Sequence, residues 1–193
     1  MTTPTEWMKS EYNDLVKKGF DWKPPVVSGP STGRAIIDDK ERIMLCANNY
    51  LSMSNHPKVK QAAVDAVKSH GAGSGSVRPI AGNMDIHNEL EDTIARFKNR
   101  EAALYYQTGF AVNSGLIPQL AGKNDSIISD QLNHGSIIDG VRLSGVKKEN
   151  RTIYAHNNMG ELEDRLKEAT KKSEKTLVIS DGVFSMDGDI APL

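Results

Sequence analysis

The chain has 193 residues, a formal net charge of −1 and 24 basic against 25 acidic side chains, without a block of like charge that would indicate nucleic acid as a partner. Its single cysteine, Cys46, excludes an intrachain disulfide framework and is typical of a reducing compartment. The first residues lack the pattern of a signal peptide, and no apolar run reaches membrane-spanning length, so we expect a cytoplasmic protein with no membrane contact.

The first 45 residues are expected to form an arm and a small hairpin outside the main core. Apolar residues recur on one side of 6–18, which predicts a helix. The short apolar runs 35–37 and 42–45 flank a polar tetrapeptide, which predicts a hairpin. Residues 46–193 then form the amino-terminal part of a larger domain.

From residue 57 onward, helical and strand patterns alternate. Such alternation argues for an α/β fold with a mostly parallel sheet flanked by helices. In sheets of this kind, ligands bind at the carboxyl ends of the strands. Helices are expected at 57–69, 86–98, 110–121, 136–144 and after Asn158, and strands at 102–106, 126–129, 152–155 and 176–180.

The stretch 176–189 ends a predicted buried strand abruptly, so its polar residues fall where an active site would be built. A first interpretation makes Asp181 the acidic group of a cofactor or metal site. Asp187 and Asp189 are better interpreted as part of a solvated turn. The five histidines show no HExxH or i,i+4 pair, so we predict no metal site.

Further motifs allow more than one interpretation. Gly109 and Phe110 lie in a turn before a helix, which is either an anion site or, more simply on these residues alone, an ordinary turn. His134 either stacks on a flat ligand and moves a proton, or caps a helix. Asn48 lies in an asparagine turn that could hold a carboxylate. The glycine-rich loop 70–82 lacks both the glycine spacing of a Rossmann loop and the lysine of a Walker motif. We therefore reject a dinucleotide-binding loop and an NTPase loop at this position.

Taken together, several motifs occur in the order and spacing of one family. The chain resembles the α-oxoamine synthases, which are pyridoxal-phosphate enzymes of fold type I. Within that family it is most similar to glycine C-acetyltransferase (2-amino-3-ketobutyrate coenzyme A ligase), on the evidence of its SVR and VRLS segments. The resemblance covers about 38–193, and its motifs are CANNYL at 46–51, SVR at 76–78 with HNELE at 87–91, LNHGSIIDGVRL at 132–143 and DGVFSMDGD at 181–189.

The resemblance implies a role for each candidate cofactor-binding residue. Gly109 and Phe110 match the turn whose backbone N–H groups bind the phosphate of pyridoxal 5′-phosphate. His134 matches the catalytic histidine that stacks on the pyridine ring and contacts substrate. Ser185 matches a serine near the phenolic oxygen of the ring. Asp181 matches an acidic position that supports the site, which replaces the first interpretation of this residue.

The implied fold is the large domain of a fold type I transferase, with its sheet incomplete and an N-terminal helix and hairpin arm. The implied reaction condenses glycine with acetyl-CoA to 2-amino-3-oxobutanoate and CoA, with Asn48 and His134 contacting the amino acid. The family also implies a homodimer with its active site at the interface. The Schiff-base lysine and the aspartate that pairs with the pyridine nitrogen are expected beyond residue 193, so we expect this chain alone to be inactive.

Two alternatives stay open on the sequence. The first keeps the mechanism but uses alanine and a longer acyl-CoA, as in 8-amino-7-oxononanoate synthase. The second is a non-catalytic subunit or fragment that lacks the Schiff-base lysine.

Overall fold

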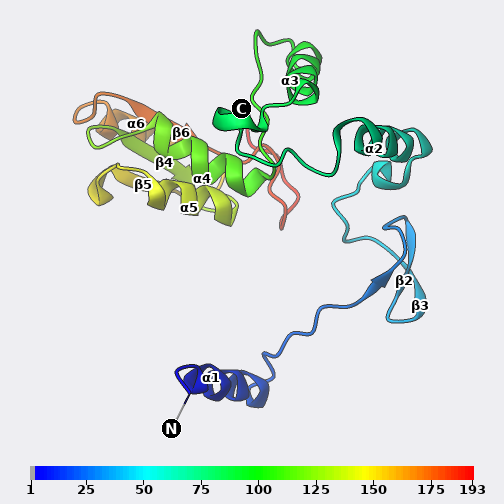
Figure 1. Cartoon of the computed structure of the whole chain (residues 1–193). Coiled ribbons are helices and arrows are strands. Elements are labelled where there is room, and N and C mark those ends of the chain that lie inside the picture. Colours follow the sequence, from blue (N-terminus) through cyan, green and yellow to red (C-terminus); the bar gives the residue numbers. More distant parts are fainter. Residues whose placement is uncertain (1–2) are drawn as a thin grey trace. The chain divides into compact units, whose positions relative to one another are not determined.

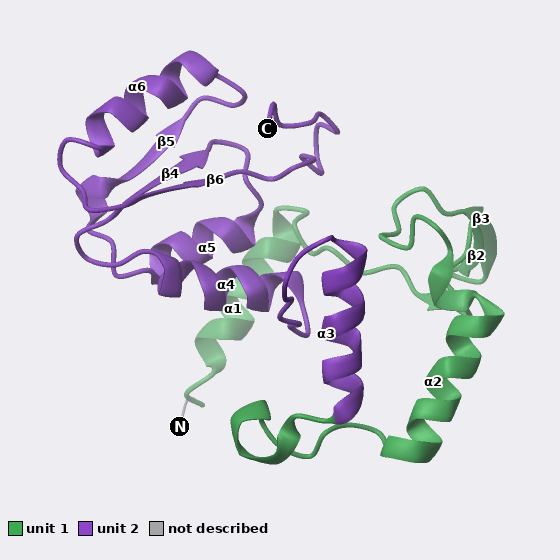
Figure 2. Cartoon of the chain, turned by 90° about the horizontal axis from the view of Figure 1, so that it is seen from above, with its two compact units in different colours: residues 1–84 green, residues 85–193 purple. Residues whose placement is uncertain are grey.

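A computed structural model describes residues 3–193. Contacts between Cα atoms divide the chain into two compact units, Met1–Met84 and Asp85–Leu193 (Figure 2), and Figure 1 labels the helices and strands. The predicted division between an arm of residues 1–45 and the rest stays a prediction. Each unit is described by itself below.

The first unit contains the predicted helix and hairpin. In the hairpin, Asp38 and Asp39 form the connection with φ of 48° and 61°, a left-handed conformation that aspartate tolerates better than most residues. The second strand therefore begins earlier than predicted. The elements are α1 (Glu6–Lys17), β1 (Val27–Ser28), β2 (Arg34–Ile37), β3 (Lys40–Ile43), a 3₁₀ turn (Met53–Asn55), α2 (Pro57–His70) and a π turn (Arg78–Gly82), with β1–β2 and β2–β3 antiparallel.

The second unit contains the parallel sheet that the sequence predicts. Its helices and strands match the predicted ones to within one residue at each end, with one exception given below. None of the helices in residues 3–193 combines the length and apolarity needed to cross a membrane. The elements are α3 (Asp85–Phe97), α4 (Gly109–Leu120), β4 (Ser126–Asp130), α5 (Gly135–Leu143), a 3₁₀ turn (Lys148–Asn150), β5 (Arg151–Tyr154), α6 (Met159–Ala169) and β6 (Thr176–Ile179).

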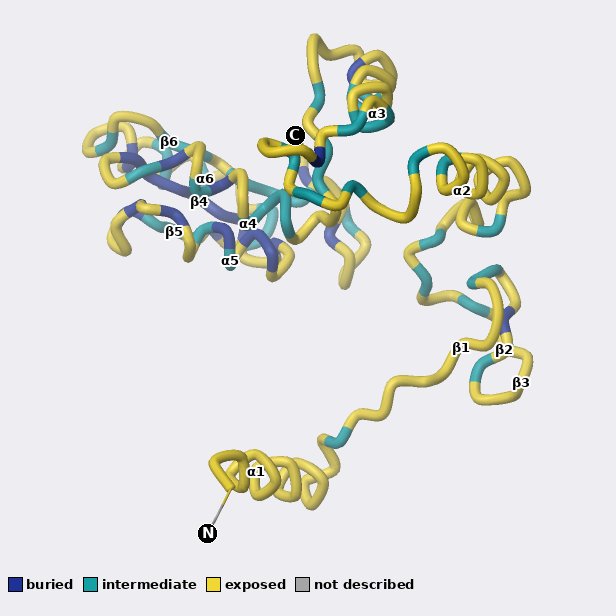
Figure 3. Tube along the Cα trace, in the orientation of Figure 1, coloured by how far each residue is buried: buried dark blue, intermediate teal, exposed yellow. Residues whose placement is uncertain are grey.

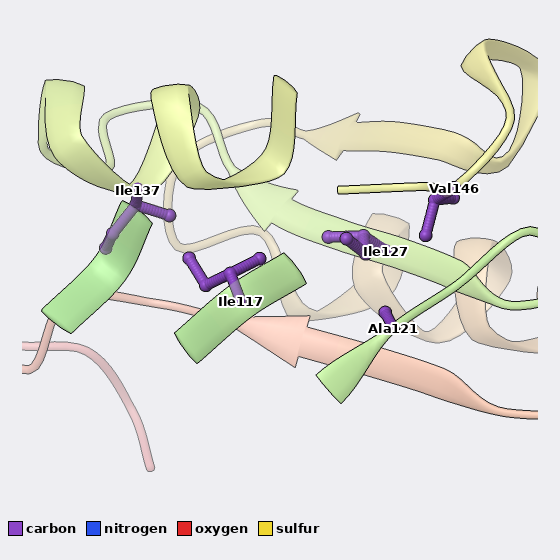
Figure 4. Packing of buried hydrophobic residues seen from close by; sticks show 5 residues of the cluster. All are labelled: Ile117, Ala121, Ile127, Ile137 and Val146. Atoms are coloured by element: carbon purple, nitrogen blue, oxygen red, sulfur yellow. The ribbon is translucent and has the colours of Figure 1, made fainter. Parts of the chain in front are cut away.

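Strand β4 is the centre of this sheet, since the strand order is β5-β4-β6 and both pairings are parallel. Every residue of β4 is buried, and the buried residues gather around it (Figure 3). Successive side chains of a strand point to opposite faces. Accordingly, Ile127 packs with Ile117 and Ile137 of α4 and α5 (Figure 4), whereas Ile128 packs with Ala169 of α6.

The strand predicted at 102–106 is wrong, because the structure shows no ladder there. A run of apolar residues becomes a strand only when a neighbouring strand pairs with its backbone. Here the Tyr105 N–H donates to the Glu91 carboxylate at 2.9 Å, so a side chain of α3 takes the hydrogen bond that a ladder would otherwise use.

Helices α4 and α5 touch at Gly140. A Cβ on this residue would lie 2.4 Å from the carbonyl oxygen of Asn113 and 2.8 Å from Cδ1 of Ile117. The first neighbour is backbone and cannot move aside without shifting α4. Glycine is therefore required by the approach of the helices and not by a turn.

We expect Gly140→Ala to lower the free energy of unfolding by about 1–3 kcal/mol, since overpacking costs that much in a tight core. The measurement is chemical or thermal unfolding of the purified protein. Gly160→Ala is the matched control, because the nearest atom to its Cβ would be Asn158 Oδ1 at an ordinary 3.5 Å. Equal stability of the two variants would contradict the helix contact.

Candidate functional site

The buried amide of Asn133 joins the carboxyl ends of β4 and β6. Its Nδ2 donates to Ser129 Oγ at 2.9 Å and to the Ile179 carbonyl oxygen at 2.8 Å. Its Oδ1 accepts from the Asp181 N–H at 2.7 Å. Because buried polar groups must find partners, these bonds fix the loop after β4 against the loop after β6.

Asp181 and His134, both predicted as site residues, lie side by side at this edge. One carboxylate oxygen of Asp181 accepts from the His134 backbone N–H at 2.7 Å. Asp181 thus holds the loop that carries His134, which agrees with a supporting role and not with direct contact to a pyridine nitrogen. The role itself stays a prediction.

His134 is the N-cap of α5, so one of the interpretations left open for it is present in the structure. Its Nδ1 accepts from the Ser136 N–H at 3.1 Å. Since Nδ1 acts as an acceptor, the neutral ring carries its proton on Nε2. The residue is exposed, so capping fixes the ring through Nδ1 and leaves Nε2–H available to a ligand.

Gly109 and Phe110 form the first turn of α4. Thr108 is the N-cap, and its Oγ1 accepts from the Ala111 N–H at 3.0 Å. First-turn N–H groups have no acceptor within their own helix and attract anions. No atom lies within 4 Å of where a Gly109 Cβ would be, so a ligand can approach this backbone closely.

A hydrogen-bonded chain connects α4 to His134. Asn113, one turn into α4, donates through Nδ2 to Ser136 Oγ at 2.9 Å. Ser136 Oγ in turn lies 2.7 Å from His134 Nδ1. The start of α4, the histidine and Asp181 therefore belong to one connected network within the second unit.

Ser185 and Asn48 are exposed, and neither takes part in the hydrogen bonds of this network. Ser185 follows β6, on the same chain segment as Asp181. Asn48 lies in the first unit, where its neighbour Asn49 donates to the Ser31 carbonyl oxygen and to Ser54 Oγ, both at 2.7 Å. Asn49 holds the loop, which leaves Asn48 on the surface; the roles of Asn48 and Ser185 stay predictions.

The sequence prediction missed a second polar cluster at the same edge. His156 Nδ1 lies 2.9 Å from Asp130 Oδ1, and its Nε2 lies 2.6 Å from Asp189 Oδ2. The solvated turn predicted at 187–189 is thus wrong for Asp189, whose carboxylate is paired. Asp130 ends β4 and His156 closely follows β5, and this placement on adjacent parallel strands was the available signal.

The pKa values of this cluster shift in opposite directions. Hydrogen bonds to Asp130 and then to Asp189 raise the pKa of His156 above its usual value. Burial of the Asp130 carboxyl opposes its ionisation. The Leu132 N–H, the His156 ring and the Asn157 N–H outweigh that effect and hold the pKa of Asp130 below its usual value. Both shifts favour the charged pair.

With the geometry described, comparison with known proteins identifies the family. The profile of the family "Aminotransferase class I and II" matches residues 40–193, which is most of the chain. The chain belongs to this aminotransferase family. The parallel sheet flanked by helices is the fold expected of it, so the predicted fold class is confirmed.

Relatives of this aminotransferase-family chain include enzymes that are not aminotransferases by name. It is 48% identical over 188 residues to 8-amino-7-oxononanoate synthase of Alkaliphilus metalliredigens, covering 97% of the chain and 47% of that protein. The identity to the synthase of the same name from Thermoanaerobacter pseudethanolicus is 50%, with the same coverage. The chain spans about half the length of these curated relatives.

Solved structures give the same result. The chain matches the serine palmitoyltransferase of Sphingomonas wittichii with a TM-score of 0.86 and 32% identity, over 99% of this chain and 47% of that one. It matches 8-amino-7-oxononanoate synthase of Francisella tularensis with a TM-score of 0.62 and 30% identity, over 76% and 38%. The predicted α-oxoamine synthase kinship and the pyridoxal phosphate cofactor are confirmed at the level of the family.

The finer prediction is not supported in the same way. The relatives named here are 8-amino-7-oxononanoate synthases and not glycine C-acetyltransferases. They favour the alternative that pairs alanine with a longer acyl-CoA. The SVR and VRLS segments, which suggested the other enzyme, are short and carry less weight than identity along nearly the whole chain.

We expect Asn133→Ala to destabilise the protein by about 1–3 kcal/mol, because it leaves the Asp181 N–H and the Ile179 carbonyl without their partner. Unfolding experiments on the purified protein measure the loss. The control is Gln131→Ala, two residues away and exposed, which should change stability by no more than about 0.5 kcal/mol. A loss in the control as large as that in Asn133→Ala would argue against the bridging role.

Proposed function

We propose that the protein containing this chain is a pyridoxal-phosphate-dependent acyltransferase of the 8-amino-7-oxononanoate synthase type. It would condense alanine with a long acyl-CoA such as pimeloyl-CoA and release CoA. The observation that carries this proposal is the identity of 48–50% with synthases of that name over almost the entire chain. The polar network at the strand ends is consistent with it.

The described residues fit pyridoxal phosphate. Helix α4 begins with Gly109, where open space replaces a side chain. The exposed ring of His134 is tied to the same helix through Ser136 and Asn113. Pyridoxal phosphate consists of a phosphate group and a flat ring. The start of α4 would bind the phosphate, and His134 would lie beside the ring.

Each predicted site residue then receives a task. The N–H groups of Gly109 and Phe110 bind the phosphate. His134 stacks on the ring, and Ser185 hydrogen-bonds its phenolic oxygen. Asp181 holds His134 in position through the backbone. Asn48 binds the carboxylate of the amino acid.

When bound, the cofactor supplies an electron sink for negative charge at the amino-acid α-carbon. The chain's own residues provide orientation and proton control. The Ser136 N–H keeps Nδ1 of His134 in an acceptor role, so Nε2–H faces the ligand as a donor. Through that proton, His134 would donate a hydrogen bond to the substrate. The cofactor-bearing lysine is expected in the part of the protein that follows residue 193.

Glycine with acetyl-CoA is the second candidate pair, and the SVR and VRLS segments at 76–78 and 141–144 favour it. Both candidates share the site and the chemistry and differ in the size of the two substrates. A non-catalytic role is the third candidate, and it predicts a protein without bound cofactor.

We also propose a homodimer, with the active site at the interface. Apolar side chains of α1 are exposed in the structure, among them Trp7, Tyr12 and Leu15. Exposed large apolar side chains are typical of surfaces that other parts of an assembly cover. Light scattering of the complete gene product should give twice the mass of its chain.

Steady-state rates test the substrate pair. The complete gene product should show a kcat/KM for alanine with pimeloyl-CoA at least about tenfold above that for glycine with acetyl-CoA, because a pocket built for longer chains gains binding energy from each methylene. The reverse preference would support the second candidate. A purified protein without a visible absorbance band removable by borohydride would contradict the enzyme proposal altogether.

Substitution of His134 separates stacking from proton control. His134→Ala should weaken pyridoxal phosphate binding and lower kcat by about 10²-fold, since both the ring and the proton are lost. His134→Phe keeps a flat ring, so it should retain cofactor affinity while kcat falls by a similar factor. Cofactor titration and turnover numbers measure the two effects. Unchanged kinetics in His134→Ala would refute the assigned role.

A further inference from the structure

The Asp130–His156–Asp189 cluster has no task in the proposed reaction. Asp130 is fully buried at the side chain, that of His156 is 21% exposed and that of Asp189 is 42% exposed. The three residues come from β4, from the loop after β5 and from the segment after β6. The cluster therefore ties a long terminal segment to the ends of two strands.

Both ring nitrogens of His156 face carboxylate oxygens, at 2.9 Å and 2.6 Å. A neutral ring would turn a lone pair toward one carboxylate, so two carboxylate neighbours favour the doubly protonated imidazolium. With both nitrogens engaged, His156 has no atom left to exchange a proton with a substrate. Within residues 3–193, no group of His, Cys, Asp and Glu converges as metal ligands do.

The segment after β6 folds into a tight turn between Phe184 and Asp189. The Phe184 N–H donates to the Asp189 carbonyl oxygen at 3.0 Å, and the Gly188 N–H donates to the Phe184 carbonyl oxygen at 2.7 Å. Val183 and Ile190 form an antiparallel bridge at its base. Ser185 lies within this turn, directly after Phe184.

His156 contacts both ends of the turn. The Phe184 ring is buried and meets the imidazole edge to face, with ring centroids 4.3 Å apart. At the other end of the turn, Asp189 Oδ2 lies 2.6 Å from His156 Nε2. The same oxygen accepts from Asn157 Nδ2 at 2.9 Å. Asp130, on the other side of the His156 ring, also accepts from the N–H groups of Leu132 and Asn157. These bonds hold Asp130 in place if the turn moves away from the sheet.

We propose that His156 is a positioning residue: as an imidazolium bridging Asp130 and Asp189, it holds the turn that carries Ser185 against the carboxyl edge of the sheet, and loss of its proton releases the turn. The link to Ser185 as a cofactor contact rests on the proposed function. The bridge itself does not.

The direction of the pH dependence follows from the surroundings of His156. The titratable groups around it are Asp130 of β4, Asp189 of the turn and, next to Asp130, Tyr154 of β5, whose pKa burial raises. The pKa of Asp130 lies below its usual value, so this carboxylate is charged at neutral pH. The pKa of His156 is raised in the folded protein, so the stabilisation of the turn is fully present below the ordinary value of 6.5 and is lost as pH rises through the higher folded value.

Hydrogen exchange of the complete gene product, without added substrate, tests the bridge. The probes are the amide protons of Phe184, Gly188 and Ala191, which donate the hydrogen bonds of the turn. Their protection factors, corrected for intrinsic exchange, should be high near about pH 6 and fall toward about pH 9. In Asp189→Asn they should be about tenfold lower at the acidic end and lose most of their pH dependence, because a charge-assisted bond becomes a neutral one.

Asp187→Asn is the matched control, since it removes the same charge two residues away from an exposed side chain. It should behave as the unmodified protein. Amides of β4 serve as an internal check, and their protection must stay unchanged in both variants. Equal protection of the turn in Asp189→Asn and Asp187→Asn, or a turn insensitive to pH in the unmodified protein, would overturn the proposal.

A second measurement separates this proposal from the proposed function. Asp189→Asn should also bind pyridoxal phosphate more weakly than Asp187→Asn. If the turn loosens as expected but no variant binds the cofactor, the bridge stands and the proposed function fails. If cofactor binding is normal throughout and the turn does not respond, the bridge fails and the proposed function stands.

Discussion

The amide of Asn133 is the interaction on which the candidate site depends. Strands β4 and β6 are parallel neighbours, so their last residues leave the sheet at the same edge with backbone groups that no further ladder satisfies. One buried side chain meets that requirement, accepting from Asp181 and donating to Ile179. Asp181 then takes the N–H of His134, and the two loops become one structure.

Apolar and polar residues are separated along the central strand of the parallel sheet. Strand β4 is buried along its whole length, with the apolar Ile127 and Ile128 at its centre and the polar Ser129 and Asp130 at its carboxyl end. Asp130 closes β4 and is fully buried at the side chain, so its charge must be matched by nearby donors. Those donors come from the loops around the end of β4. The hydrogen bonds that satisfy the buried carboxylate therefore also fix these loops.

Much of the second unit could be predicted from the sequence, because its strands are short apolar runs and its helices have regular apolar spacing. The helix predicted after Asn158 is an example, since α6 begins there and Asn158 Oδ1 caps it by accepting from the Glu161 N–H at 3.0 Å. The strand predicted at 102–106 is absent from the structure, although the segment has the composition of a strand. Strand formation depends on a pairing partner, which no local sequence pattern reveals.

The candidate site was predictable to a similar degree. His134 and Asp181 were found because each lies in the loop after a strand, and the structure brings them together. His156 and Asp189 were missed because they lie far apart in sequence, and a histidine or aspartate in a polar loop looks like any other. The order of the strands in the sheet brings the two residues together, and the hydrophobic periodicity of the sequence does not encode that order.

The close contact at Gly140 has a consequence for how such a site could change. The helices α4 and α5 touch closely at Gly140 and are joined by the Asn113–Ser136 hydrogen bond, so the helix start at Gly109 and the histidine at the start of α5 belong to one packed unit. A shift of one helix would therefore move the other, so their packing sets the distance between the start of α4 and His134. A substitution that separates these two helices would therefore move the start of α4 away from His134, whereas substitutions in the exposed segments around them would leave that distance unchanged.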